Sequence, residues 1–127
     1  MNSSNPILVV EDQAALRTLA RMWLEFEGYE VVLASDGVEG LQRFVESKPD
    51  LIVTDMDMPY MNGIELSRAV RATSDVPILL WSSNPIPTEL TLDSRPIIDG
   101  YVFKSGDSKD LVGPITKLLP VNEQVSV

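Results

Sequence analysis

Residues that can do chemistry directly follow short apolar runs at four places in the sequence. They are Glu11 and Asp12, Asp55, Ser82, and Lys104. Carboxylates, a hydroxyl and an amine are groups that phosphoryl transfer uses, provided that a cation neutralises the charged oxygens. The chain has no cysteine and no histidine. This composition excludes disulfides, thiolate nucleophiles, zinc–cysteine sites and histidine general bases.

Three carboxylates that lie close together need a compensating charge. Two carboxylates about 5 Å apart repel each other by about 3 kcal/mol at an effective dielectric constant of about 20. Without compensation, this repulsion raises the pKa of at least one of them. Mg²⁺ prefers carboxylate, carbonyl and water oxygens and would remove the repulsion. Since cysteine and histidine are absent, the natural nucleophile is an aspartate, which would form an acyl phosphate.

These residues act together only if the fold brings them to one place. Apolar runs that predict β-strands alternate along the chain with segments of helical periodicity. We expect strands at residues 7–10, 30–34, 51–54, 77–81 and 101–103. Their continuous apolar character is typical of strands that are buried on both faces.

Apolar residues at helical spacing predict the helices between the strands. The first stripe, which Gly28 is placed to end, consists of Leu16, Leu19, Ala20, Trp23 and Leu24. The second, which Ser35 or Asp36 can cap, consists of Val38, Leu41, Phe44 and Val45. The third follows Gly63 and consists of Ile64, Leu66, Ala69 and Val70. A last helix is expected over residues 108–119.

This alternation predicts an α/β fold with a parallel sheet, right-handed crossovers and helices on both faces. Five strands in 127 residues suggest a flavodoxin-like, doubly wound fold. The expected strand order 2-1-3-4-5 comes from this fold class and not from the periodicity of the sequence. We expect one domain over residues 1–120, with 121–127 as a tail or the start of a linker. Ligands of such sheets bind beyond the carboxyl ends of the strands. The acidic residues, the serine and the lysine would meet there.

Two segments break the helical pattern. Residues 84–96 should hold the fourth helix, but they contain Pro85, Pro87 and Pro96. A proline inside a helix costs about 3 kcal/mol, so this helix is expected to be short or disrupted. The Gly113-Pro114 pair lies within the last helix and should kink it or delay its start.

In combination and order, the polar residues resemble the receiver domain of the two-component response-regulator family over nearly the whole chain. The resemblance rests on Glu11-Asp12 after ILVV, Asp55 in the turn DMDMPYMNG, Ser82 after PILLW, and Lys104 after GYVF. Pro59 and Gly63 also match the family's turn after the acceptor.

The resemblance implies a site and a function. Asp55 would accept a phosphoryl group from a histidine kinase or a histidine phosphotransfer protein. Mg²⁺, or Mn²⁺ in its place, would be held by Glu11, Asp12, Asp55 and the backbone carbonyl of Asp57. Ser82 would donate a hydrogen bond to the phosphoryl group, and Lys104 would pair with it. Tyr101 matches the aromatic switch residue that moves inward when the hydroxyl is recruited.

The chain departs from the family at Ser105, because a proline usually follows the lysine, often after a cis bond. A cis bond before any other residue costs about 2.5–4 kcal/mol, so we expect a trans bond and a differently shaped loop. This departure, the proline-rich segment and Gly113-Pro114 all fall on the face that passes the signal to partners in the family.

Each site residue also has a structural interpretation. Asp12 can cap the first helix, and Asp57 can be a solvated turn residue. Lys104 can be a solvated lysine at a strand end, and Ser82 an ordinary loop serine. Tyr101 can be a packed aromatic, and Trp81 is expected in the core.

Three functional hypotheses remain. The leading one is a phosphoacceptor that signals by protein contacts and is not an enzyme, although it assists its own phosphorylation and dephosphorylation. The second is a phosphatase of the haloacid dehalogenase type, with Asp55 as nucleophile and Asp57 as general acid. Pro59 stands where that motif has threonine or valine. The third is a degenerate receiver that acts only as an interaction module.

The net charge of −9 argues against nucleic-acid binding through this domain, because such binding relies on lysine and arginine. No apolar run is long enough to insert into a membrane, and the N-terminus lacks a signal pattern. We expect a cytoplasmic bacterial protein with an unknown downstream protein target. It is either a stand-alone receiver or the N-terminal part of a longer chain.

Overall fold

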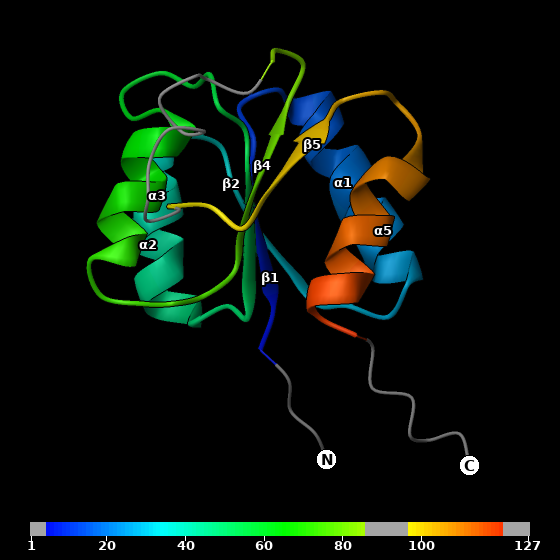
Figure 1. Cartoon of the computed structure of the whole chain (residues 1–127), viewed down its shortest axis with the longest axis horizontal. Coiled ribbons are helices and arrows are strands. Elements are labelled where there is room, and N and C mark those ends of the chain that lie inside the picture. Colours follow the sequence, from blue (N-terminus) through cyan, green and yellow to red (C-terminus); the bar gives the residue numbers. More distant parts are fainter. Residues whose placement is uncertain (1–4, 86–96, 121–127) are drawn as a thin grey trace.

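The computed structural model describes residues 5–85 and 97–120. Its centre is a five-stranded parallel sheet in the order β2-β1-β3-β4-β5 (Figure 1), so the predicted strand order is confirmed. The strands are β1 (Ile7–Val10), β2 (Val31–Ala34), β3 (Leu51–Thr54), β4 (Ile78–Ser82) and β5 (Gly100–Phe103).

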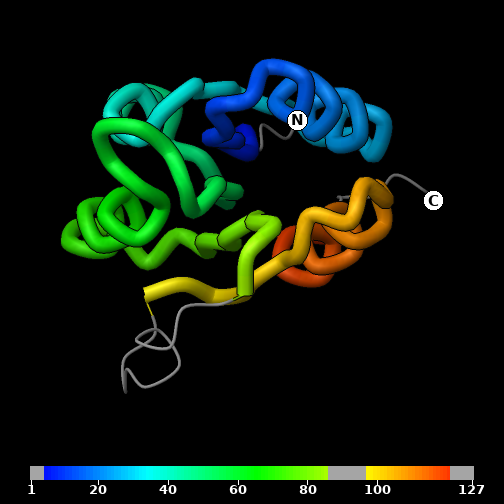
Figure 2. Tube along the Cα trace, turned by 90° about the horizontal axis from the view of Figure 1, so that it is seen from above, coloured from blue at the N-terminus to red at the C-terminus, as the bar shows by residue number. Residues whose placement is uncertain are grey.

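Helices cover both faces of the sheet, as expected of a flavodoxin-like fold. They are α1 (Ala14–Phe26), α2 (Gly37–Ser47), α3 (Gly63–Arg71) and α5 (Ser108–Leu118). Helices α1 and α5 lie on one face and α2 and α3 on the other (Figures 1 and 2). The fourth helix, predicted to be short or disrupted within residues 84–96, falls mostly on residues 86–96, which lie outside the described residues. Within the described ranges, no helix combines the length and apolar character needed to cross a membrane.

Alternation along the strands creates two cores, because successive side chains of a strand point to opposite faces. The core under α1 and α5 contains Ile7, Val9, Ala20, Leu24, Leu51, Val53, Leu79, Trp81, Val102, Leu111 and Ile115. The core under α2 and α3 contains Leu8, Val10, Ala34, Ile52, Met58, Leu66, Val70 and Ile78. Both faces of the central strands are therefore buried, as their apolar runs predicted.

Polar side chains cap the first turns of α2 and α3. Asp36 accepts a hydrogen bond from the backbone N–H of Glu39 (2.8 Å) at the start of α2. Asn62 and Glu65 form a capping box at the start of α3, which satisfies two backbone N–H groups. The N-cap of α1 is Gln13, without a side-chain cap. The interpretation of Asp12 as a helix cap is therefore wrong.

The predicted inward face of α2 is partly wrong. Val38 and Val45 are 46% and 65% exposed, whereas Leu41 and Phe44 pack against the core. Glycine explains the difference: a Cβ at Gly40 would come within 3.0 Å of a Val10 methyl, so this side of the helix lies directly on the sheet. The pattern of apolar side chains could not indicate that Gly40 faces the sheet, because glycine has no side chain.

Gly113-Pro114 does not delay the start of the last helix, and the alternative expectation of a kink at this pair stays a prediction. α5 begins at Ser108 and continues through Pro114, although proline has no N–H to donate to the carbonyl four residues earlier. Asp107 caps the helix by accepting a hydrogen bond from the N–H of Lys109 (2.9 Å). Leu111 and Ile115 are fully buried. Burial of this stripe compensates for the hydrogen bond that Pro114 omits.

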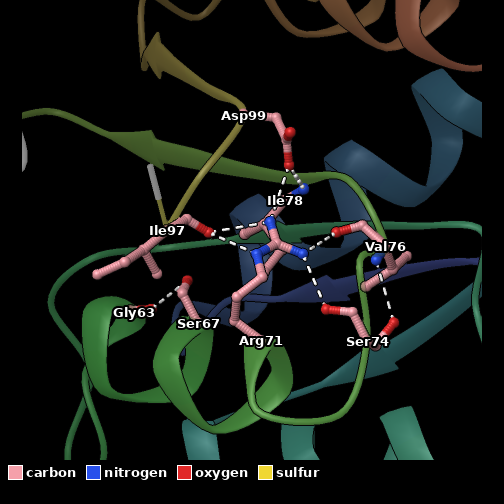
Figure 3. Close-up of polar contacts among 8 residues, drawn as sticks. All are labelled: Gly63, Ser67, Arg71, Ser74, Val76, Ile78, Ile97 and Asp99. Atoms are coloured by element: carbon pink, nitrogen blue, oxygen red, sulfur yellow. Dashed lines mark hydrogen bonds and ion pairs between the residues drawn. The ribbon is translucent and has the colours of Figure 1, made fainter. Parts of the chain in front are cut away.

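Arg71, at the end of α3, joins segments that are distant in sequence (Figure 3). Its guanidinium donates to the carbonyls of Val76 (2.7 Å) and Ile97 (2.9 and 3.2 Å), and pairs with the carboxylate of Asp99 (3.0 Å). That carboxylate also accepts from the N–H of Ile78 (2.8 Å). Arg71 thus fixes the start of β4 and the approach to β5 at the edge of the sheet where these strands begin.

We expect Arg71→Ala to lower the free energy of unfolding by about 2–4 kcal/mol, because it leaves partly buried carbonyls without their charged donor. Arg68→Ala is the matched control, since Arg68 is exposed one turn earlier in α3; its effect should stay within about 0.5 kcal/mol. Urea unfolding of both variants makes the comparison. Equal losses would contradict the role of Arg71.

Candidate functional site

Strand alternation places three of the predicted site residues on one face of the sheet. Glu11, Asp55 and Lys104 each follow a valine of the α1–α5 core by two residues. These valines are Val9, Val53 and Val102. Because residues i and i+2 of a strand share a face, the three polar side chains leave the ends of β1, β3 and β5 on the same side.

An ion-pair cluster joins these side chains. The Nζ of Lys104 lies 2.8 Å from Oε1 of Glu11 and 3.1 Å from Oδ1 of Asp55. The side chains of Lys104, Glu11 and Asp55 are only 11%, 0% and 6% exposed. The interpretation of Lys104 as a solvated strand-end lysine is therefore wrong. Its ammonium group compensates two carboxylates that are withdrawn from water.

Burial and ion pairing act on the same three groups. Burial raises the pKa of the Asp55 carboxyl, although Lys104 and the backbone N–H of Met56 counteract it. Burial likewise raises the pKa of Glu11 against the effect of Lys104. For Lys104, burial lowers the pKa, but the two carboxylates outweigh it and the net shift is upward. Two carboxylates with raised pKa values beside one cation indicate a site that would accept more positive charge.

Asp12 completes an acidic cluster with these carboxylates. Glu11, Asp12 and Asp55 each offer one oxygen, and these oxygens lie within 4.8 Å of one another. Asp12 is exposed, whereas the other two are buried. Although Oε1 of Glu11 is ion-paired with Lys104, it is buried without a hydrogen bond of good geometry to any residue in the described ranges. A set of hard oxygen donors fits Mg²⁺ or Mn²⁺.

The backbone around Asp55 is tightly constrained. Oδ1 of Asp55 accepts a hydrogen bond from the N–H of Met56 (2.8 Å), and the hydroxyl of Thr54 donates to the Asp55 carbonyl (2.9 Å). Gly63 begins α3 directly against this carbonyl: a Cβ at Gly63 would lie 2.3 Å from it. Only glycine fits at this position, so the turn from 55 to 63 is fixed between β3 and α3.

Ser82 and Tyr101 lie on neighbouring strands near the cluster. Ser82 is buried at the end of β4, and its hydroxyl oxygen accepts from the N–H of Asn84 (3.1 Å). Within the described residues, no hydrogen bond joins Ser82 to Asp55. The hydroxyl of Tyr101 is buried and has no hydrogen-bond partner among these residues. The roles of Ser82 and Tyr101 in switching stay predictions.

Three contacts of the site were missed by sequence reasoning. The Asp57 carboxylate, expected to be merely solvated, is exposed but accepts a hydrogen bond from the Asn84 side chain (2.7 Å). Arg17 donates to the Glu11 carbonyl (2.8 Å). The ring of Trp81 lies 5.2 Å from the Nζ of Lys104. The sequence did offer a signal for the Asn84 contact, because Asn84 is a polar residue two positions after Ser82. The contact between Trp81 and Lys104 could be predicted only from the pairing register of β4 and β5.

The loop after Lys104 takes a form that suits serine. The peptide bond before Ser105 is trans, as expected. The Ser105 hydroxyl accepts from the N–H of Asp107 (3.1 Å) and is hydrogen-bonded to the carboxylate of Asp110 in the first turn of α5. These bonds connect the end of β5 to α5.

A family model described as the response regulator receiver domain matches residues 7–116. The chain belongs to the response regulator receiver domain family. Curated relatives include the DNA-binding response regulator MtrA of Mycobacterium tuberculosis, which is 33% identical over 117 residues, 92% of this chain and 51% of its own length. The response regulator MprA of Mycobacterium leprae is 37% identical over 114 residues, 89% of this chain and 50% of its own length. This receiver domain thus spans about half the length of these curated relatives.

Solved structures show the same fold. The chemotaxis protein CheY4 of Vibrio cholerae has a TM-score of 0.83 and 29% identity, covering 92% of this chain and 100% of its own. The response regulator TrrA of Thermotoga maritima has a TM-score of 0.80 and 32% identity, covering 91% of this chain and 99% of its own. The TrrA structure is a complex with Mg²⁺ and BeF.

The raised pKa of Asp55 gives a testable pH dependence. A carboxyl group whose pKa is higher in the folded than in the unfolded protein destabilises the fold at pH values above its folded pKa. As the pH falls through that pKa, the group becomes protonated and the lost stability is regained. We compare the free energies of unfolding of the wild type and Asp55→Asn without divalent ions. The difference, wild type minus variant, should increase as the pH is lowered from about 7 to about 4. Urea unfolding measures it. The variant controls for titrating groups outside the cluster of Glu11, Asp55 and Lys104. A difference that falls toward acid pH would contradict the prediction.

Proposed function

We propose that this receiver domain is a Mg²⁺-dependent phosphoacceptor in a two-component or phosphorelay pathway. Asp55 takes a phosphoryl group from a histidine kinase or a histidine phosphotransfer protein. The observation that carries the proposal is the buried Asp55 carboxylate, paired with Lys104 and placed beside Glu11 and Asp12. This arrangement supplies a nucleophile, a fixed ammonium group and a place for a metal ion at one edge of the sheet.

Glu11, Asp12, Asp55 and the backbone carbonyl of Asp57 are the proposed metal-holding groups. A bound Mg²⁺ would neutralise the carboxylates and the oxygens of an incoming phosphoryl group. The oxygen-only donor set and the two raised carboxyl pKa values support this assignment. Asp12 is the exposed member of the set, so the acidic cluster is open to solvent on its side.

The chain's own residues then have separate parts in phosphoryl transfer. The Asp55 carboxylate attacks phosphorus, the bond to the donor's histidine nitrogen breaks, and an acyl phosphate forms on Asp55. Lys104 compensates charge on the transferred group from its position between Glu11 and Asp55. Since the Ser82 hydroxyl oxygen accepts its bond from Asn84, its O–H can still donate to a phosphoryl oxygen.

Signalling follows by protein contacts in this proposal. Tyr101 is the proposed switch, because its hydroxyl is buried without a partner among the described residues and a new hydrogen bond would relieve this cost. The downstream target is a protein rather than nucleic acid bound by this domain, consistent with its net charge of −9. The phosphatase alternative needs the Asp57 carboxyl as a general acid, but that group is held by Asn84 outside the ion-pair cluster.

Acetyl phosphate tests the proposal directly. We expect wild-type protein with acetyl phosphate and Mg²⁺ to gain the mass of one phosphoryl group, and Asp55→Asn to gain none. Removal of Mg²⁺ by a chelator should also prevent the gain, because the repulsion between carboxylates and phosphoryl oxygens is then uncompensated. Intact-protein mass spectrometry is the measurement.

Asp57→Asn is the matched control, because it changes a neighbouring aspartate in the same turn and retains the backbone carbonyl. It should still accept the phosphoryl group. Loss of labelling in this variant would favour the phosphatase mechanism. No added mass in the wild type, or equal labelling of Asp55→Asn, would overturn the proposed function.

A further inference from the structure

The indole ring of Trp81 forms a third contact of the Lys104 ammonium group. The Nζ of Lys104 lies 5.2 Å from the ring centroid, within the range of a cation–π interaction. Trp81 is 3% exposed and the Lys104 side chain 11%. Because both groups are withdrawn from water, the attraction is screened less than at an exposed site.

The strand register explains this contact. Trp81 of β4 is paired with Val102 of β5, and Lys104 follows Val102 by two residues. Lys104 therefore lies on the same face of the sheet as Trp81, at the diagonal position that long side chains can span. Trp23 of α1 packs edge-on against Trp81, with 6.4 Å between ring centroids and 69° between planes. The strand register, which does not depend on Trp23, sets the place of the Trp81 ring beside Lys104.

The three contacts of Lys104 respond differently to phosphorylation. The proposed function changes the surroundings of both carboxylates. Glu11 and Asp55 are proposed to hold Mg²⁺, and when Asp55 becomes an acyl phosphate its negative charge lies on the phosphoryl oxygens instead of the carboxylate. The Trp81 ring takes no part in those events. Of the three described contacts, it is the one whose partner group is neither a proposed metal ligand nor the phosphoryl acceptor.

We propose that Trp81 is a positioning residue for Lys104. The ring keeps the ammonium group at the strand ends when Glu11 and Asp55 hold Mg²⁺ or the phosphoryl group. Lys104 then stays in place to contact the incoming phosphoryl oxygens and does not move into solvent. This inference rests on the proposed function. It adds that the aromatic residue before Ser82 sets the efficiency of phosphorylation without touching the phosphoryl group.

Proton NMR of the metal-free protein tests the contact itself. A methylene group above an indole ring experiences a ring-current shift, so the ε-CH₂ protons of Lys104 should resonate upfield of those of Lys48, Lys109 and Lys117. Trp81→Leu should abolish this difference, and Trp81→Phe should retain part of it. The phenylalanine variant keeps an aromatic ring and remains informative if the leucine variant fails to fold.

The rate of phosphorylation by acetyl phosphate at fixed Mg²⁺ tests the consequence. We expect Trp81→Leu to lower this rate by about fivefold, as the loss of a desolvated cation–π contact predicts, with Trp81→Phe between it and the wild type. Trp23→Leu is the matched control, because it removes an indole from the same core without removing the ring beside Lys104. It should keep both the Lys104 shift and the rate.

An ordinary Lys104 shift in the wild type would overturn the inference. So would a Trp81→Leu rate within about twofold of the wild type, or an equal loss in Trp23→Leu, which would assign the effect to core packing. If the wild type takes up no phosphoryl group, the proposed function fails and the inference fails with it. If the wild type is labelled and the Trp81 variants are unaffected, the inference alone fails.

Discussion

The Lys104 ammonium group is the constraint on which the site depends. Buried carboxylates repel each other and lose the hydration of water, and both effects disfavour their charged forms. Lys104 lies within 3.1 Å of Glu11 and Asp55 and compensates both. The pKa values of the two carboxyls nevertheless remain raised. Lys104 thus compensates the two carboxylates in part, and they still favour further positive charge.

The rest of the fold serves to bring this cation and these carboxylates to one edge. Parallel strands in the order β2-β1-β3-β4-β5 place the ends of β1 and β3 side by side, and strand alternation directs their side chains to one face. Close packing fixes the turns around them, since neither Gly63 nor Gly37 has room for a side chain. On the opposite edge, Arg71 ties the beginnings of β4 and β5 to α3. The site is therefore rigid on the strands, and its exposed member is Asp12.

Sequence reasoning predicted the features that depend on local pattern and chain order. The strands follow from apolar runs that end in polar residues. The sheet order was inferred from the fold class, and together with those runs it predicted that Glu11, Asp55 and Lys104 converge. It failed where a residue acts through a neighbour that is distant in sequence. Val38 and Val45 are exposed because glycine, rather than valine, lies on the sheet. Trp81 was expected to be core only, and it is core, but register with β5 also places its ring beside Lys104.

Lys104 compensates the buried charge of Asp55, and a double-mutant cycle in metal-free protein tests this compensation most directly. Urea unfolding gives the free energy for the wild type, Lys104→Met, Asp55→Asn and the double variant. Lys104→Met alone should cost about 3 kcal/mol, because it leaves buried carboxylates unpaired. In the Asp55→Asn background the same substitution should cost less by at least about 1 kcal/mol. Equal costs in the two backgrounds, within about 0.5 kcal/mol, would contradict the account.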